Sequence, residues 1–293
     1  MKKIILMALI SYMLSFSFAQ SWEIPLFTAI ERNSFSEIKK LVEQGEDVNQ
    51  DNFAGQFPLE YAVWHECDIE ILQYLIEHGA AVNPTIISVN SEPPLLRSLD
   101  KQNASFETVK FLVKFGADIK ALNHYGDSAL MIAAKNVDDM RIIDFLIQTG
   151  IDINIKNKYE RTALHLAASA QKPNTIKVLI QAGADINAKT NDGDTPLIVA
   201  VNTLVAKYET AEQLVKLGAN LNLQNKKGMT ALMGACKKVT IDSIIKLLLD
   251  FNADATLEDE TGRTALEYLD SNKSKYIRES LIRKRLKDMV YKR

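Results

Sequence analysis

Short apolar segments alternate with polar turn sequences at a nearly constant period along most of the chain. A Pro-Leu or Ala-Leu pair that suits the first turn of a helix recurs eight times, at intervals of 33 to 36 residues. Proline fits there because the first amide of a helix has no acceptor within the helix. The eight pairs begin at Pro25, Pro58, Pro94, Ala129, Ala163, Pro196, Ala231 and Ala265. We therefore expect eight repeated units, each with a helix opening at one of these positions.

A second landmark keeps the same period. Residues able to adopt the left-handed backbone that ends a helix recur at intervals of 33 to 37, at Gly45, Gly79, Gly116, Gly150, Gly183, Gly218 and Asn252. Between the two landmarks, apolar positions such as Ile176, Val178 and Leu179 predict a pair of short helices in each unit. The polar tip 191–193 that follows predicts a two-stranded hairpin turn into the next unit.

The residues at these landmarks resemble those of ankyrin repeats. Residues 162–168 read T-A-L-H-L-A-A and residues 195–197 read T-P-L, close to the family pattern T-P-L-H-x-A-A. The resemblance covers 24–270 and implies an all-α ankyrin-repeat solenoid of helix-turn-helix units with short β-hairpin connections. Within a repeat domain of 20–270, the approximate repeats are 21–51, 52–86, 87–121, 122–154, 155–187, 188–222, 223–256 and 257–270.

Three repeats depart from this pattern. The third follows a long connection from Pro84 to Ser91 and lacks the tip glycine, and the fifth carries Glu160 where that glycine would stand. The eighth has no helix-ending glycine, as expected of a terminal repeat that caps the stack.

Both ends of the chain read differently from the repeats. Residues 1–19 combine a basic start, an apolar run that is too short to span a bilayer, and small residues at 17 and 19. This pattern predicts a secretory signal peptide cleaved after Ala19, with an uncleaved signal anchor as the alternative. We therefore expect a periplasmic or secreted protein with no transmembrane segment after cleavage.

The last segment, 271–293, carries nine Lys or Arg residues against two acidic ones. Its apolar residues recur at helical spacing, at Ile277, Leu281, Leu286 and Met289. We interpret it as a basic amphipathic helix that caps repeat eight with its apolar face. The alternative is a basic tail for an acidic partner or an anionic lipid.

Composition narrows the possible partners. The chain is 47% hydrophobic and 25% charged, and its formal net charge is −2. These values are typical of a globular protein and give no argument for binding nucleic acid or a membrane surface.

Cys67 and Cys236 lie five repeats apart, about 50 Å at roughly 10 Å per packed layer. A disulfide within one extended stack is therefore not expected.

Candidate catalytic motifs in the sequence have a structural explanation. Residues 126–130, Gly-Asp-Ser-Ala-Leu, look like a hydrolase block, yet Ser128 occupies the helix-capping position that Thr162 and Thr195 hold in other repeats. The run His65-Glu66-Cys67 has no second cluster to complete a zinc site. We expect no catalytic residue, no metal and no cofactor, and therefore a non-enzymatic protein.

The resemblance also implies where a partner binds, because ankyrin stacks use the hairpin tips and the inner face of the first helix. The predicted contact residues are Phe53, Gln56, Trp64, His65, His124, Tyr125, Asp127, Lys158, Tyr159, Arg161, Lys226, Lys227, Lys237 and Lys238. The same register also exposes Lys135, Asn136, Asn191, Asp192, Asp194, Asn202 and Met229.

Two groups stand out among these residues. Phe53, Trp64, Tyr125 and Tyr159 are large aromatics of the kind that often carry binding energy. Four lysines gather in repeat seven. Together, the aromatic residues and the lysines predict a partner with an apolar or aromatic patch at one end and acidic groups at the other. Alternatively, Trp64 fills the gap beside the irregular third repeat and the lysines keep the surface soluble. On the first interpretation, Trp64→Ala and Tyr125→Ala weaken binding at little cost in stability.

The sequence as a whole favours a monomeric protein-interaction scaffold in the bacterial periplasm. Two alternatives remain, an immunity protein that neutralises an envelope toxin and an exported effector that binds host proteins. An enzyme with accessory repeats is disfavoured because the repeats fill nearly all of the chain after the signal segment. The sequence does not identify the partner.

Overall fold

The computed structural model describes residues 24–85, 91–238, 242–271 and 281–291. The predicted signal peptide, 1–19, and Ile277 of the predicted capping helix lie outside these ranges. The chain divides into two units, one made of the residues up to Ser98 with Glu107–Asp118, the other of Leu99–Phe106 and Ile119–Arg293. From Pro25 to Asp250 the helices follow the predicted pattern of short paired segments.

The first unit holds most of three helix pairs. Its helices are α2 (Pro25–Glu31), α3 (Phe35–Glu43), α4 (Pro58–Trp64), α5 (Ile69–Glu77), α6 (Pro94–Ser98) and α7 (Phe106–Lys114). Helix α4 packs against α2 and α6, and α3 packs against α5. The third pair is irregular, as the sequence indicated, because α6 has only five residues.

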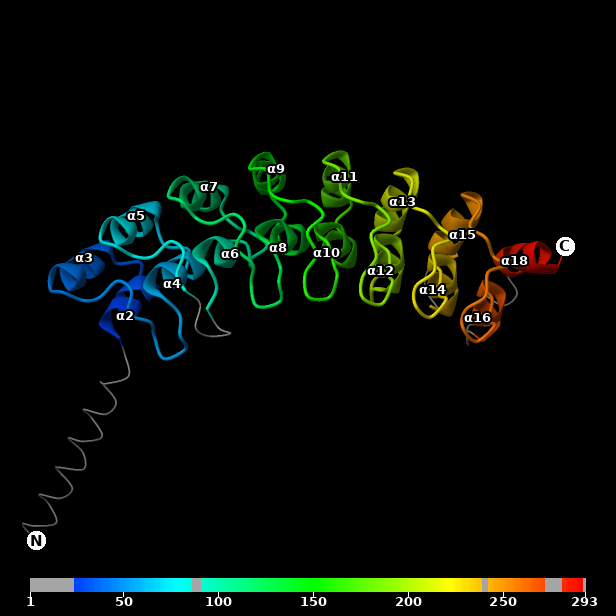
Figure 1. Ribbon diagram of the computed structural model, residues 1–293, viewed down its shortest axis with the longest axis horizontal. Helices are drawn as coiled ribbons and strands as arrows, with labels where there is room; N and C mark the ends of the chain where they lie inside the picture. Colours follow the sequence, from blue (N-terminus) through cyan, green and yellow to red (C-terminus); the bar gives the residue numbers. More distant parts are fainter. Residues whose placement is uncertain (1–23, 86–90, 239–241, 272–280, 292–293) are drawn as a thin grey trace, which may run out of the picture. The chain divides into compact units, whose positions relative to one another are not determined.

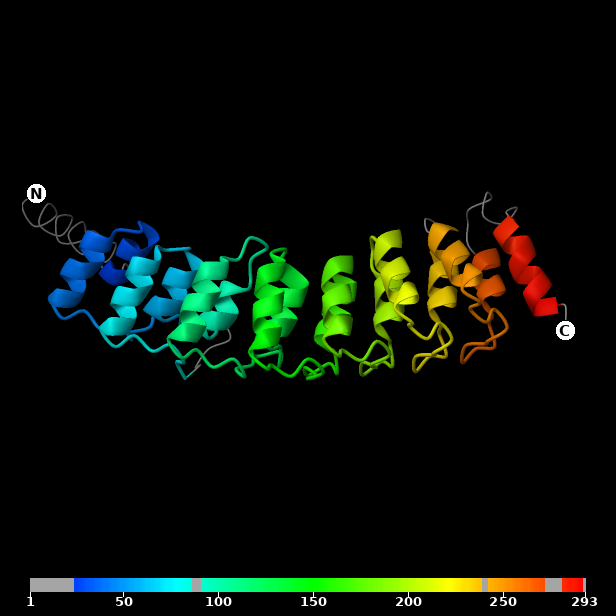
Figure 2. The same ribbon diagram turned by 90° about the horizontal axis from the view of Figure 1, so that it is seen from above.

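The second unit repeats the same pair four times and then ends with two helices. Its helices are α8 (Ala129–Asn136), α9 (Met140–Gln148), α10 (Ala163–Ser169), α11 (Pro173–Gln181), α12 (Pro196–Asn202), α13 (Tyr208–Lys216), α14 (Ala231–Lys237), α15 (Asp242–Asp250), α16 (Ala265–Ser271) and α18 (Leu281–Tyr291). In this unit α8, α10, α12, α14 and α16 form a first-helix layer, and α9, α11, α13 and α15 form a second-helix layer (Figure 1). Seen from above, the turns between repeats lie along one edge of the unit (Figure 2).

Buried leucines lie at the start of the first helices within each of the two units. The leucine after each helix-opening Pro or Ala is at most 3% exposed, at Leu26, Leu59, Leu95, Leu130, Leu164, Leu197, Leu232 and Leu266. Burying each side chain contributes about 1.5–3 kcal/mol relative to leaving it in water. Because a single pair cannot bury its own apolar face, each repeat depends on its neighbours.

The caps and helix ends follow the predicted chemistry. The Ser128 hydroxyl accepts a hydrogen bond from the Met131 amide at 3.4 Å, and Thr195 and Thr230 cap α12 and α14 in the same way. Ser128 is thus a helix cap, as its register predicts. Asn252 has a φ of 63°, so it takes the left-handed conformation of the glycines that end the other second helices.

The predicted all-α class is confirmed, while the hairpin connections are shorter than expected. Among the described residues the connections are turns without strands, apart from one isolated antiparallel bridge between Leu122 and Ser128. The two sides of each turn are too short to form strands, because the next helix begins directly after the hydrogen bonds that close the turn. Within the same described ranges, no helix is long and apolar enough to cross a bilayer.

The last helix, α18, packs on α15 and α16 and forms two ion pairs with them. Leu286 is fully buried, Arg283 pairs with Asp270 at 2.6 Å, and Arg285 pairs with Asp250 at 2.5 Å. Leu281 was expected on the buried face, but it is 85% exposed because it stands at the first position of the helix. The described part of the segment is therefore a docked helix, with two of its cations neutralised.

Candidate functional site

The turn tips of the second unit have one shared construction. Each tip is a five-residue loop in which the first amide donates to the fifth carbonyl, as in Asn123 to Asp127 at 3.0 Å. The side chain of the first residue also accepts hydrogen bonds from backbone amides later in the same loop, as Asn123 Oδ1 does from Tyr125 and Asp127. The five tips are 123–127, 157–161, 190–194, 225–229 and 259–263.

Backbone hydrogen bonds join these tips into one ladder. The backbone N–H of the second residue in a tip donates to the carbonyl of the third residue in the preceding tip, at 2.9–3.1 Å. The donors are Lys158, Asn191, Lys226 and Glu260. The ladder requires close approach, because a Cβ on Gly228 would lie 2.7 Å from the Asp259 Cα. Tip residues at equivalent positions therefore form aligned rows across five repeats.

The third positions of the tips form a row that changes character along the unit. The row runs Tyr125, Tyr159, Asp192, Lys227 and Thr261. Tyr125 and Tyr159 are 47% and 51% exposed, so the ladder holds two aromatic rings largely in solvent. The His124 ring contacts that of Tyr125, with centroids 3.7 Å apart and the planes tilted by 46°. The Arg161 guanidinium lies 5.8 Å from the centre of the Tyr159 ring. Lys158 is exposed beside them.

Asp127 is bound within the ladder. Its Oδ1 accepts a hydrogen bond of 2.6 Å from the Nδ2 of Asn157 in the next tip. The same pairing joins Asp194 to Asn225 at 2.7 Å. These two carboxylates align neighbouring tips. This structural role explains Asp127 and Asp194 without a contact to a partner protein.

The predicted contact residues of the first unit lie around α4. Phe53 is 73% exposed at the tip of its turn, and the Gln56 side chain accepts a hydrogen bond from Asn52 at 3.2 Å. His65 is exposed at the end of α4, with its ring 4.3 Å from that of Tyr61.

Trp64 is half-buried, with the Arg97 guanidinium 5.2 Å from the centre of its ring. Arg97 also binds the fully buried Glu60 at 2.8 Å, and the Ser91 hydroxyl and the Glu92 amide donate to the same carboxylate. Glu60 stands where the best-matching repeat has His165. This network holds the shortened α6, and it makes Trp64 part of the packing beside the third repeat.

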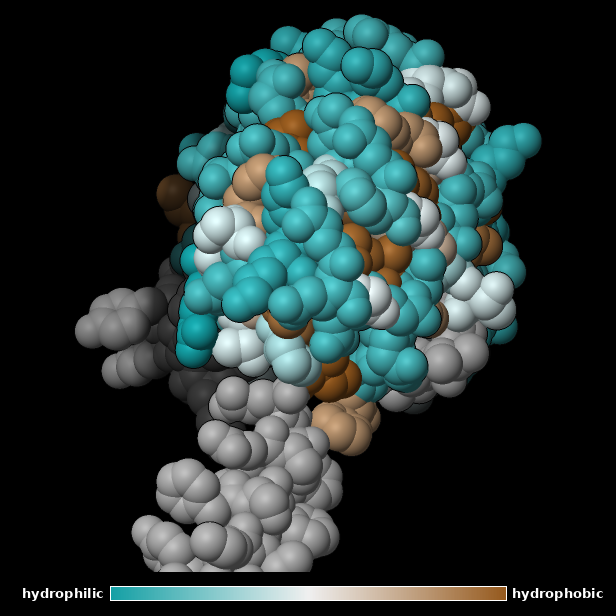
Figure 3. Space-filling model, turned by 90° about the vertical axis from the view of Figure 1, so that its left-hand side faces the viewer, coloured by the Kyte–Doolittle hydropathy of each residue, from teal (hydrophilic) through white to brown (hydrophobic). Residues whose placement is uncertain are grey.

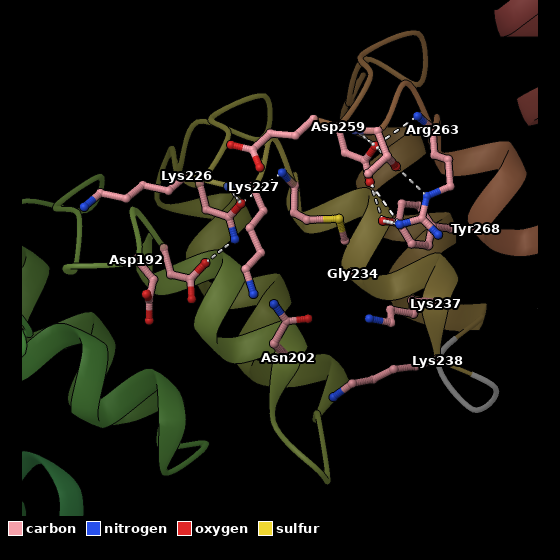
Figure 4. A pocket seen from close by; sticks show the side chains of 15 residues that line it. Asp192, Asn202, Lys226, Lys227, Gly234, Lys237, Lys238, Asp259, Arg263 and Tyr268 are labelled. Carbon is pink, nitrogen blue, oxygen red and sulfur yellow. Dashed lines mark hydrogen bonds and ion pairs between the residues drawn. The ribbon is translucent and has the colours of Figure 1, made fainter.

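A hollow of about 780 Å³ lies on the tip side of repeats six to eight. It is lined by Asp192, Asp194, Asn202, Asn225, Lys226, Lys227, Met229, Gly234, Lys237, Lys238, Asp259, Glu260, Thr261, Arg263 and Tyr268. These residues come from three neighbouring tips and from α12, α14 and α16 (Figure 4). The four lysines predicted in repeat seven all line this one hollow.

One wall of the hollow is formed by repeat eight, through Asp259, Glu260, Thr261, Arg263 and Tyr268. The sequence did not predict this wall, because repeat eight was interpreted as a cap. Asp259 accepts hydrogen bonds from the Tyr268 hydroxyl and from Arg263, the latter at 3.4 Å. Burial alone would raise the pKa of Asp259, but hydrogen bonds from Tyr268 and Thr261 outweigh it and lower the pKa. The signal that could have revealed this wall is Gly262, which continues the tip register into repeat eight.

A second hollow, of about 580 Å³, lies in the first unit between α2 and α3. Figure 3 faces this end and shows apolar side chains scattered among polar ones. The lining of this second hollow includes Arg32, Glu37 and Lys40. Arg32 and Glu37 lie 3.8 Å apart, so their charges offset one another.

Both cysteines and one histidine are buried in the core. Across the part of the chain that the structure describes, no three His, Cys, Asp or Glu residues are placed to hold a metal. Cys67 and Cys236 are buried and form no disulfide, and burial raises the pKa of the Cys67 thiol to about 11. His165 is fully buried, and burial lowers its pKa to about 4.

Comparison with known proteins agrees with this architecture. The family model "Ankyrin repeats (3 copies)" matches residues 7–86, 90–157, 131–222 and 202–289. One ankyrin repeat protein of Acanthamoeba polyphaga mimivirus is 42% identical over 62 residues, which are 21% of this chain and 42% of that protein. A second from the same virus is 38% identical over 79 residues, 27% of this chain and 48% of that protein. The chain thus spans less than half the length of each of these relatives. Because the family matches extend over most of the sequence, the chain belongs to the ankyrin repeat family.

Proposed function

We propose that this chain is a non-enzymatic scaffold that holds a partner protein against the tips and first-helix layer of its second unit. The observation that carries the proposal is the hollow over repeats six to eight, whose lining includes charged side chains that the fold does not use for packing. The hydrogen-bonded ladder holds the backbone of the tips that carry several of these side chains, which lowers the entropic cost of binding.

The partner's surface follows from the order of side chains along the ladder. Tyr125 and Tyr159 offer aromatic area at repeats four and five, and Lys227 offers a cation at repeat seven. Aromatic residues supply much of the energy of protein interfaces, and exposed charges mainly supply selectivity and association rate. The partner that fits combines an apolar patch with acidic groups two or three repeats away.

We also propose that the protein acts in a bacterial periplasm or outside the cell. The support is the segment 1–19, with its basic start, apolar run and small residues before the predicted cut. The test is the mass of the N-terminal peptide of the protein from fractionated cells. A chain beginning at Gln20 in the periplasmic fraction supports export, and an intact Met1 in the cytoplasmic fraction contradicts it.

The binding proposal is tested by capture with matched charge reversals. Tagged wild-type protein, Lys227→Glu/Lys237→Glu and Lys177→Glu/Lys246→Glu are each incubated with extract, and the bound proteins are quantified by mass spectrometry. Lys177 and Lys246 are exposed on α11 and α15 of the second-helix layer, so the control carries the same change of charge elsewhere. We expect a protein that wild type and control retain and the hollow variant loses. Equal recovery by all three contradicts the proposal.

A further inference from the structure

The four lysines of the hollow are not equivalent. The Lys238 ammonium donates a hydrogen bond to the Thr203 carbonyl and so ties the end of α14 to the end of α12. Lys226 points away from the hollow, whereas Lys227 and Lys237 point into it (Figure 4). Within the described residues, neither the Lys227 nor the Lys237 ammonium has a hydrogen-bond or ion-pair partner. Two cations therefore face the hollow without a counterion in this part of the chain.

The carboxylates nearest to the floor of the hollow are already committed. Asp194 accepts the Asn225 amide at 2.7 Å, and Asp259 is bound by Tyr268 and Arg263. Asp192 and Glu260 remain, but they are exposed at the tips of repeats six and eight, on either side of Lys227. The hollow is thus cationic at its centre and acidic at its two edges.

Asn202 lies between the two lysines in this view of the hollow (Figure 4). It is the last residue of α12, it is exposed, and its side-chain amide has no hydrogen-bond partner among the described residues. It lies over Gly234 of α14, where an added Cβ would stand 2.7 Å from the Asn202 Oδ1. A glycine inside a helix disfavours the helix relative to alanine. Here its missing side chain gives the Asn202 amide room at the floor.

We propose that Lys227, Lys237 and Asn202 form a recognition pocket for side-chain carboxylates on an acidic segment of a partner protein. Two ammonium groups and an amide N–H are the donors that a carboxylate accepts from. The acidic edges disfavour a dense, doubly charged group such as phosphate and leave the centre to a singly charged one. This inference rests on the proposed function and adds to it the chemistry of the group that is bound.

The probe is a dye-labelled octaglutamate peptide capped at both ends, so that only side-chain carboxylates are present. Its binding to the full chain is followed by fluorescence anisotropy at low salt, with a capped octaglutamine peptide as the uncharged comparison. We expect binding of the glutamate peptide alone, weakening as salt is raised, because exposed charges are screened. Competition by inorganic phosphate and by free glutamate is measured in parallel.

Two variants separate the pocket from general charge. Lys227→Gln/Lys237→Gln is expected to lower affinity for octaglutamate about tenfold, the sum expected for two exposed ion pairs. The control Lys177→Gln/Lys246→Gln removes the same charge from the second-helix layer and should bind as wild type does. Gly234→Ala adds a methyl group at the floor and favours α14, so it should weaken binding without lowering the melting temperature.

Equal affinity in the pocket variant and the control would overturn the pocket, since binding would then follow net charge alone. Absence of octaglutamate binding to wild type would do the same. Stronger competition by phosphate than by free glutamate would overturn the choice of carboxylate. In all three cases, a partner whose capture still depends on Lys227 and Lys237 would leave the proposed function standing with a different ligand chemistry.

Discussion

The Nε2 of His165 lies 3.1 Å from the carbonyl oxygen of Asp194, so a buried side chain of repeat five holds the tip of repeat six. The other ring nitrogen, Nδ1, accepts from the Thr162 amide at 3.1 Å. The ring is therefore neutral, with its proton on Nε2, and it fixes the tip row from within the first-helix layer. The geometry of the binding surface depends on this internal contact.

Acid should weaken the protein through His165. Burial lowers the folded pKa to about 4 from the ordinary 6.5, so the unfolded chain takes up this proton first as the pH falls. The stabilisation is complete above about pH 6.5, is lost between there and about pH 4, and does not change further below. We expect about 2 kcal/mol less stability at pH 5 than at pH 8 from this group. Urea unfolding of wild type and His165→Gln at both pH values measures it, and an equal pH dependence in both would refute the assignment.

Alanine should be tolerated less at Gly228 than at Gly183. Both glycines have positive φ, 72° and 98°, so alanine costs about 1 kcal/mol of backbone strain at either site. At Gly228 the methyl group also meets the backbone of Asp259 and Glu260 at 2.7 Å, whereas nothing lies within 4 Å at Gly183. We expect Gly228→Ala to cost about 1–3 kcal/mol more in unfolding free energy. Equal losses would mean that the tips do not approach closely in solution.

Glycine should stabilise the fifth tip when it replaces Glu160. Glu160 has a φ of 56°, in the left-handed region that side chains disfavour. Its ion pair with Lys156, at 2.8 Å, is exposed and contributes little. Glu160→Gly should therefore raise the unfolding free energy by about 0.5–1 kcal/mol. Glu160→Gln, which keeps the strain and removes the charge, should stay within about 0.5 kcal/mol of wild type.

Removing Trp64 should cost more stability than removing Tyr125. Trp64 is half-buried against Arg97, so Trp64→Ala leaves a gap beside α6 and should cost about 2 kcal/mol or more. Tyr125 is 47% exposed at a tip, and Tyr125→Ala should cost about 0.5 kcal/mol. Thermal unfolding of the two variants tests this difference. The structure thereby favours the alternative that Trp64 fills the gap beside the third repeat, while Tyr125→Ala keeps the small cost expected from the sequence.

The repeat itself could be predicted from the sequence because its features are local. The helix-opening pairs, the Ser128 cap and the left-handed Asn252 each depend on residues close in the chain, and the structure has them as expected. His165 of the same motif bonds to the Thr162 amide, three residues away, and to the Asp194 carbonyl in the next repeat.

The site was harder to predict because it depends on contacts between repeats. Lys237 and Lys238 are adjacent in sequence, yet only Lys238 reaches the Thr203 carbonyl, 35 residues away. Trp64 looked like a surface aromatic because its partner Arg97 belongs to the irregular third repeat. The repeat-eight wall was overlooked because a terminal repeat is expected to cap the stack and not to line a site.

Hydrogen exchange of the complex locates the surface that binds the partner without any substitution. The captured partner is added to the full chain, and deuterium uptake of each peptide is compared with and without it. We expect slower exchange in the tips from 123–127 to 259–263 and in the ends of α12 and α14 that line the hollow, with exchange in α9, α11, α13 and α15 unchanged. Protection confined to those four second-layer helices would contradict it.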